Sequence, residues 1–121
     1  MDRQSLGKFG ENLACEELAR RGYAILATRH RTRFGEIDII AEDNGVLVFV
    51  EVKTRRTMRR GSAAEALTPA KRRRVAAMAL DYLAWTDGLD RPCRFDVVAI
   101  DYAGSPRMTL RVIDNAWVMD R

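Results

Sequence analysis

Two apolar runs joined by a short polar turn constrain the fold of this chain most strongly. Gly35–Ala41 and Val46–Lys53 are rich in β-branched residues, and Glu42–Gly45 between them holds an Asp-Asn-Gly turn signal. This pattern predicts a β-hairpin. The second run is apolar at nearly every position until its end, which is typical of a central strand covered on both faces. The hairpin is therefore expected to lie inside the molecule.

Three charged residues interrupt this apolar hairpin: Asp38 in the first strand, then Glu51 and Lys53 at the end of the second. Alternation along a strand places Glu51 and Lys53 on one face, roughly 7 Å apart. An uncompensated charge in such surroundings costs several kcal/mol, which predicts a metal site. In the alternative, the protein is a scaffold and the cluster is a structural ion pair in which Lys53 bridges Asp38 and Glu51. One lysine against two or three carboxylates, however, leaves excess negative charge that calls for a cation.

The lysine itself is informative because this chain prefers arginine. Lys8, Lys53 and Lys71 are its only lysines, so 18 of the 21 basic residues are arginine. A compact ammonium can orient a water more readily than a guanidinium can, and the pKa of the ammonium itself shifts more readily. Lys53 is therefore expected to take part in chemistry, with a lysine that merely snorkels from a strand end as the alternative.

Positive charge is concentrated directly after the hairpin. From Lys53 to Arg74 there are nine basic residues and one acid, so this segment carries +8 and leaves −4 for the rest of a chain whose net charge is +4. Such a segment is expected to bind a phosphate backbone, and a solvated loop and helix face is the alternative. The candidate nucleic-acid-binding residues are Arg55, Arg56, Arg59, Arg60, Lys71, Arg72, Arg73 and Arg74, with Arg31 and Arg33 on the preceding strand.

Length and composition predict one globular domain over residues 1–121, with 47% hydrophobic and 31% charged residues. No apolar run is long enough to span a membrane, and Met1–Gln4 does not begin a signal peptide. Cys15 and Cys93 have no metal-type spacing and are expected to be reduced thiols. A cytoplasmic location follows as an expectation.

Two helices and five strands are predicted, and the two strands of the hairpin are among them. Ser5 is expected to cap a helix that runs to about Arg21, where Gly22 ends it. Thr68-Pro69 is expected to start a second helix, which reaches about Trp85. Asp96 lies in an apolar strand and is expected to pair with an arginine or to accept hydrogen bonds from loop amides. The predicted strands are Tyr23–His30, Glu36–Ala41, Val46–Lys53, Arg94–Asp101 and Met108–Asp114, with a helical turn at Ala63–Leu67.

Asp38, followed after twelve residues by Glu51-Val52-Lys53, resembles the D…ExK signature of the PD-(D/E)XK nuclease superfamily. More closely, the chain resembles the YraN-type family of small bacterial proteins, which is similar to archaeal Holliday junction resolvases. The resemblance implies a single α/β restriction-endonuclease-like domain of three layers, with a mixed sheet flanked by helices in the order αβββαββ. The matching stretches are Gly7–Glu11, Arg33–Asp38, Leu47–Arg55, Glu65–Leu67 and Arg94–Val98.

The resemblance also implies a Mg²⁺ (or Mn²⁺) dependent nuclease that acts on DNA, with branched or structured DNA as a candidate substrate. Asp38, Glu51, the Val52 carbonyl and Glu11 would hold the metal, and Lys53 would orient the attacking water. Because resolvases act as symmetric dimers, a homodimer is a further expectation. The alternative function is a non-catalytic nucleic-acid-binding module that keeps the nuclease fold.

Three details depart from the family pattern or extend it. The proline of the superfamily name is absent, since Ile37 precedes Asp38, and family members often carry Asn and Trp ahead of the Gly-Glu-Ile-Asp motif, where this chain has Arg29-His30-Arg31. Glu36 alternates onto the face of Asp38 and is a candidate outer ligand, although a plain surface carboxylate is the favoured interpretation.

Overall fold

The computed structural model describes residues 1–57 and 67–119, and in these ranges the elements follow the predicted order αβββαββ. The candidate residues Arg59 and Arg60 lie outside the described residues. The predicted helical turn at 63–67 also lies outside them, except for Leu67. The elements are α1 (Arg3–Arg20), β1 (Ala24–Thr32), β2 (Gly35–Asp43), β3 (Val46–Thr54), α2 (Pro69–Trp85), β4 (Cys93–Asp101) and β5 (Thr109–Trp117).

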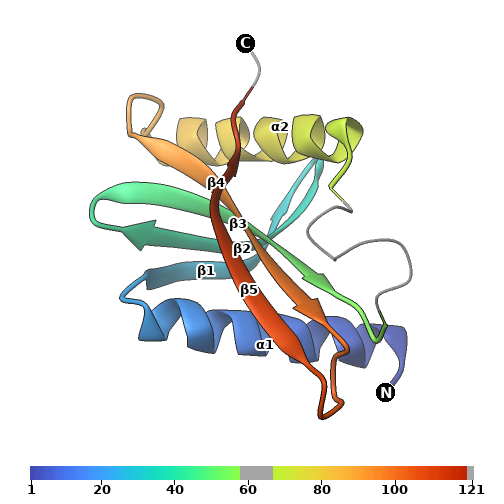
Figure 1. Cartoon of the computed structure of the whole chain (residues 1–121). Coiled ribbons are helices and arrows are strands. Elements are labelled where there is room, and N and C mark those ends of the chain that lie inside the picture. Colours follow the sequence, from blue (N-terminus) through green and yellow to red (C-terminus); the bar gives the residue numbers. More distant parts are fainter. Residues whose placement is uncertain (58–66, 120–121) are drawn as a thin grey trace.

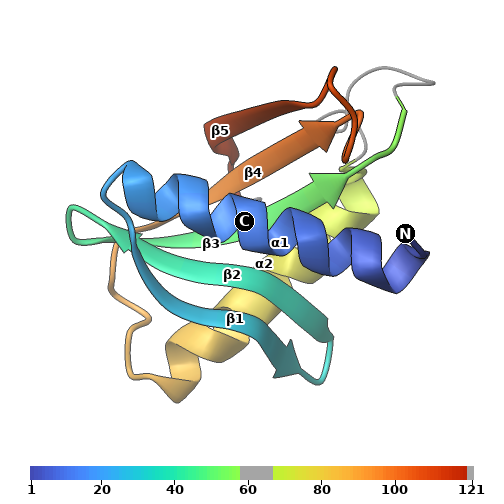
Figure 2. The same ribbon diagram turned by 90° about the horizontal axis from the view of Figure 1, so that it is seen from below.

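The five strands form one mixed sheet in the order β1-β2-β3-β4-β5. Neighbours are antiparallel except β3 and β4, which are parallel and are connected through α2. The helices cover opposite faces of this twisted sheet (Figures 1 and 2). The prediction of a three-layer α/β fold with β3 as a central strand is confirmed.

Alternation along β3 divides the core into two parts. Phe49 faces α2 and packs with Met78, Ala79 and Phe95, among others. Val48 and Val50 belong to the cluster that includes Ala14 and Leu18 of α1. The apolar run of β3 is continuous because both of its faces are buried. None of the helices in the described ranges is long and apolar enough to cross a membrane.

The start of α1 differs from the prediction. Asp2, not Ser5, is the N-cap, and its side chain accepts a hydrogen bond of 2.7 Å from the backbone N–H of Ser5. Ser5 therefore lies inside the first turn. The other end agrees with the sequence, since Gly22 has φ +95°, a left-handed conformation that glycine adopts without strain.

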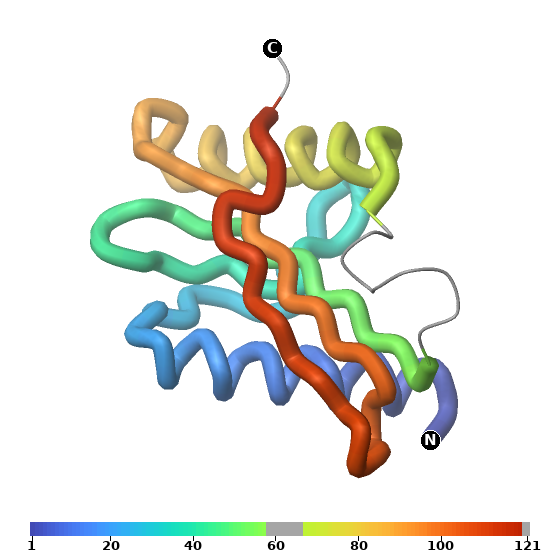
Figure 3. The backbone as a smooth tube through the Cα atoms, viewed as in Figure 1, coloured from blue at the N-terminus to red at the C-terminus, as the bar shows by residue number. Residues whose placement is uncertain are grey.

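Gly10 lets α1 approach the end of β3. A Cβ at this position would lie 1.8 Å from Thr54 Oγ1, far inside any van der Waals contact. Figure 3 shows the N-terminal half of α1 and the end of β3 at the same end of the sheet. This close approach fixes how near the next residue, Glu11, comes to the strands.

We expect Gly10→Ala to destabilise the protein by about 2 kcal/mol, because helix and strand must separate to admit the methyl group. Gly7→Ala is the matched control: its Cβ would meet nothing within 4 Å, and helix propensity alone should stabilise it by up to about 1 kcal/mol. Urea denaturation followed by circular dichroism measures both. Equal effects of the two substitutions would contradict the close approach.

Candidate metal centre

β2 separates from β3 at the position of Asp38. The last pair of the β2–β3 ladder on this side is Ile39 with Val50, whereas β2 stays paired with β1 as far as Gly35. Asp38 Oδ2 instead accepts a hydrogen bond of 2.8 Å from the backbone N–H of Val52. A carboxylate thus takes the place of a ladder carbonyl, and this opening in the sheet is where polar side chains gather.

Arg29 lies on β1 between the residues paired with Ile37 and Ile39 of β2. Its φ is +51°, in the left-handed region that Asn tolerates better than Arg. Arg29 Nε donates to Glu11 Oε1 of α1 over 2.6 Å. The side chain of Glu11 is 17% exposed, so this ion pair ties the helix carboxylate to the sheet at the level of Asp38.

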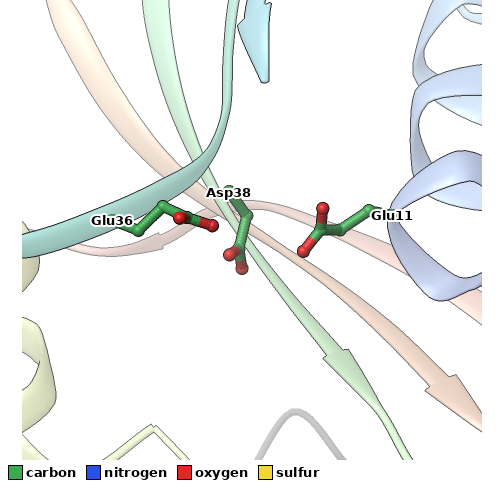
Figure 4. A group of neighbouring side chains, drawn as sticks. All are labelled: Glu11, Glu36 and Asp38. Carbon is green, nitrogen blue, oxygen red and sulfur yellow. The ribbon is translucent and has the colours of Figure 1, made fainter. Parts of the chain in front are cut away.

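Three carboxylates converge at this level from two elements. Oxygens of Glu11, Glu36 and Asp38 all lie within 4.8 Å of one another, and Figure 4 shows Asp38 between the other two. Glu36 is exposed, as the interpretation of a surface carboxylate expects, and its side chain also joins the group. Close oxygens with hard-ligand chemistry are what Mg²⁺ or Mn²⁺ binds, so the donor set fits the predicted metal.

The electrostatics of Asp38 agree with this geometry. Burial raises its pKa from 3.8 to about 8, and the charges of Glu51 and Glu11 add to the rise. The hydrogen bond from Val52 and the charge of Lys53 act in the opposite direction without cancelling it. Residues 1–57 and 67–119 therefore supply too little positive charge near this carboxylate to keep it ionised at neutral pH.

Glu51 and Lys53 share a face of β3, as predicted, with Lys53 Nζ 3.4 Å from Glu51 Oε1. Glu51 does not join the close group of three, although its charge acts on Asp38. Within the described ranges Lys53 forms no ion pair with Asp38, so it does not bridge the two acids. The charge of Lys53 is the main cause that lowers the pKa of Lys71 of α2, and burial is the second.

The basic residues surround the carboxylates unevenly. Arg31 and Glu36 come within 3.8 Å on the β1–β2 hairpin, and Arg33 lies over the ring of Phe34. An open groove beside the cluster is lined by Arg3, Gln4, Gly7, Lys8, Glu11, Arg29, Arg31 and Glu36.

The basic run on α2 is split between two sides of that helix. On one side, Lys71 lies near Lys53 and the side chain of Arg74 lies near Gly35. Arg72 and Arg73 instead line a groove that also contains Trp117. Arg55 and Arg56 follow directly after β3; the backbone of Arg55 pairs with Ile100 and Ala103.

Two residues that position the site were not singled out from the sequence. Arg29 was named only in a departure from the family pattern, and Gly10 only within the matching stretch Gly7–Glu11. The available signal was weak: a glycine inside a predicted helix, which can mark a point of close contact.

The conformation of Arg29 can be tested by two substitutions that remove the same ion pair. Arg29→Asn should keep most of the stability, because Asn adopts positive φ readily, whereas Arg29→Val should lose about 1–2 kcal/mol more. Thermal unfolding of both variants measures this difference. Equal stability of the two would show that the left-handed conformation is not required in solution.

The sequence was compared with known protein families and proteins. A model of the family described as uncharacterised protein family UPF0102 matches residues 10–100. The UPF0102 protein STH1475 of Symbiobacterium thermophilum is 51% identical over 112 residues, which cover 93% of this chain and 95% of that protein. A UPF0102 protein of Anaeromyxobacter dehalogenans is 48% identical over 88% of this chain and 80% of its own length. One from Dehalococcoides mccartyi is 41% identical, covering 95% and 94%.

Proposed function

The chain belongs to the UPF0102 family, and we propose that its carboxylate cluster is the Mg²⁺ or Mn²⁺ site of a nuclease that hydrolyses phosphodiester bonds of DNA. Family membership confirms the YraN-type part of the sequence prediction; placement in the PD-(D/E)XK superfamily remains a prediction. The observation that carries the proposal is the convergence of Glu11, Glu36 and Asp38 beside Lys53, with the pKa of Asp38 raised to about 8.

Glu11, Asp38 and Glu51 would hold the metal, with Glu36 as an outer carboxylate and the Val52 carbonyl as a further ligand. When bound, the metal would neutralise charge on the phosphate and lower the pKa of a bound water. A cation among these oxygens would also offset the burial and the repulsion by Glu51 and Glu11 that raise the pKa of Asp38.

The basic side chains would orient the attacking water and bind the phosphates. Lys53, held 3.4 Å from Glu51, would orient the attacking water and donate to a phosphate oxygen. Lys71 brings a second ammonium to Lys53, and two like charges in contact favour an anion between them. Arg31 of β1, Arg33 of the β1–β2 turn and Arg74 of α2 would contact the flanking phosphates.

The test is cleavage of a panel of duplex, single-stranded, flap and four-way-junction DNA by the purified protein with Mg²⁺, with Mn²⁺ and with EDTA. We expect metal-dependent cleavage that Lys53→Met removes. Arg20→Met, which deletes one exposed charge at the other end of α1, is the control and should cleave normally.

Cleavage that persists in EDTA or in Lys53→Met would overturn the assignment. Absence of cleavage by the wild type, combined with salt-sensitive DNA binding that Lys53→Met retains, would instead favour the non-catalytic binding module. The panel also identifies the preferred DNA shape, including whether branched DNA is favoured.

A further inference from the structure

An apolar groove runs along the outer side of α2, between this helix and the end of β5. It encloses about 430 Å³ and is lined by α2 from Pro69 to Leu80 and by residues 117–119. Leu80 is 46% exposed and Val118 is 77% exposed at its edges. Large apolar side chains that gather in this way on a small protein commonly mark a contact surface.

A second hollow of about 540 Å³ continues the groove past the middle of α2. Leu80 and Met119 line both hollows, and Leu89, which is 64% exposed, lines the second. The apolar surface thus extends along the length of α2 instead of forming an isolated pocket.

The charges on this side of α2 are self-complementary. Arg73 and Asp81 lie four residues before and after Ala77, the central residue of the 17-residue helix. Arg72 and Arg73, which line the groove, lie in its first half, whereas Asp81 lies in its second half and Asp87 and Asp90 follow its end. Neither Arg73 nor Asp81 forms an ion pair within residues 1–57 and 67–119.

We propose that this groove binds a second copy of the same chain, with the two α2 helices antiparallel across a twofold axis near Ala77. In that arrangement Arg73 of each copy faces Asp81 of the other, because both residues lie at equal distances from the axis. Ala77 permits close approach of the helices, and Leu80 of each copy enters the groove of the other. A twofold axis makes every contact twice, so one charge pair contributes two ion pairs to the dimer.

The dimer does not depend on nuclease activity, because the groove is lined by residues other than the carboxylate cluster and Lys53. If both proposals hold, the dimer carries two symmetry-related sites, as cleavage of two strands requires.

The proposal is tested by sedimentation equilibrium of the full chain over a wide concentration range. We expect a monomer–dimer equilibrium for the wild type. Arg73→Glu and Asp81→Arg should each weaken the dimer by about tenfold or more, because each places like charges across both symmetric contacts. Both positions are on the helix surface, and circular dichroism verifies that the variants are folded.

Mixing the two single variants gives the sharpest result. Glu at position 73 of one chain then faces Arg at position 81 of the other, while Asp81 faces Arg73, so a hetero-pair should form with affinity near that of the wild type. A mass tag on one variant identifies the hetero-pair. A wild type that is monomeric throughout, or a mixture that associates no better than either variant alone, would overturn the proposal.

Discussion

Asp38→Asn should abolish metal-dependent cleavage and, in metal-free protein, raise stability at alkaline pH. Asparagine keeps the shape of the side chain and an oxygen that can accept from the Val52 N–H, but it cannot carry the charge that a cation would bind. We expect cleavage to fall by about two orders of magnitude or more. The same substitution removes a buried carboxyl that lies among like charges.

The pH dependence of this stability effect follows from the shift in pKa. Asp38 titrates near 3.8 in the unfolded chain and at about 8 in the folded protein. Between these values the folded state retains a proton that the unfolded state has lost, so rising pH favours unfolding. The contribution of Asp38 to stability is therefore fully present below about pH 4 and is lost as the pH rises through about 8.

Thermal unfolding of wild type and Asp38→Asn in EDTA measures this contribution across the pH range. The two midpoints should differ least near the acidic end and most at or above about pH 8, where the variant should be the more stable. A difference that does not change with pH would contradict the raised pKa, and retained cleavage would contradict the role of Asp38.

Asp96→Asn should cause the largest loss of stability, about 3 kcal/mol or more. Asp96 is 1% exposed and accepts from Arg94 Nε at 3.0 Å, Tyr23 Oη at 2.9 Å and the Asn115 N–H at 2.9 Å. Arg94 also donates to Asp43. These bonds join the α1–β1 connection, the β2–β3 hairpin, β4 and β5, and they confirm the expectation that Asp96 pairs with an arginine.

The substitution removes the buried negative charge and turns a donor toward Arg94 or Tyr23, so one of these bonds is replaced by a contact between two donors. Urea denaturation gives the free energy of unfolding. Asp114→Asn is the control, because Asp114 is an exposed aspartate on β5 and should change stability by less than about 0.5 kcal/mol. Equal effects of the two substitutions would mean that the buried network contributes no more than a surface charge does.

The sheet was predictable because its signals are local. The Asp-Asn-Gly turn and the continuous apolar run of β3 identify the hairpin and its central place, and the αβββαββ order follows. Ends of elements were less well determined. Asp2 and Ser5 are both good caps only three residues apart, and the sequence alone favours neither strongly.

The grouping of the carboxylates was only partly predictable. Strand alternation places Glu36 and Asp38 on one face, but whether Glu11 reaches them depends on how closely α1 approaches β3, which Gly10 and Thr54 decide. The left-handed conformation of Arg29 has no local signal in the sequence of β1. Both features arise from tertiary contacts, which periodicity does not report.

Binding of a divalent cation is the most direct test of the central claim, because it requires neither the right DNA nor a protein partner. Mn²⁺ is titrated calorimetrically into wild type, Asp38→Asn and Glu11→Gln near neutral pH, in two buffers with different ionisation enthalpies. We predict saturable binding by the wild type with proton release from Asp38, and much weaker binding without that release by Asp38→Asn. Absence of binding by the wild type, or equal binding and equal proton release by Asp38→Asn, would contradict the carboxylate cluster as a metal centre.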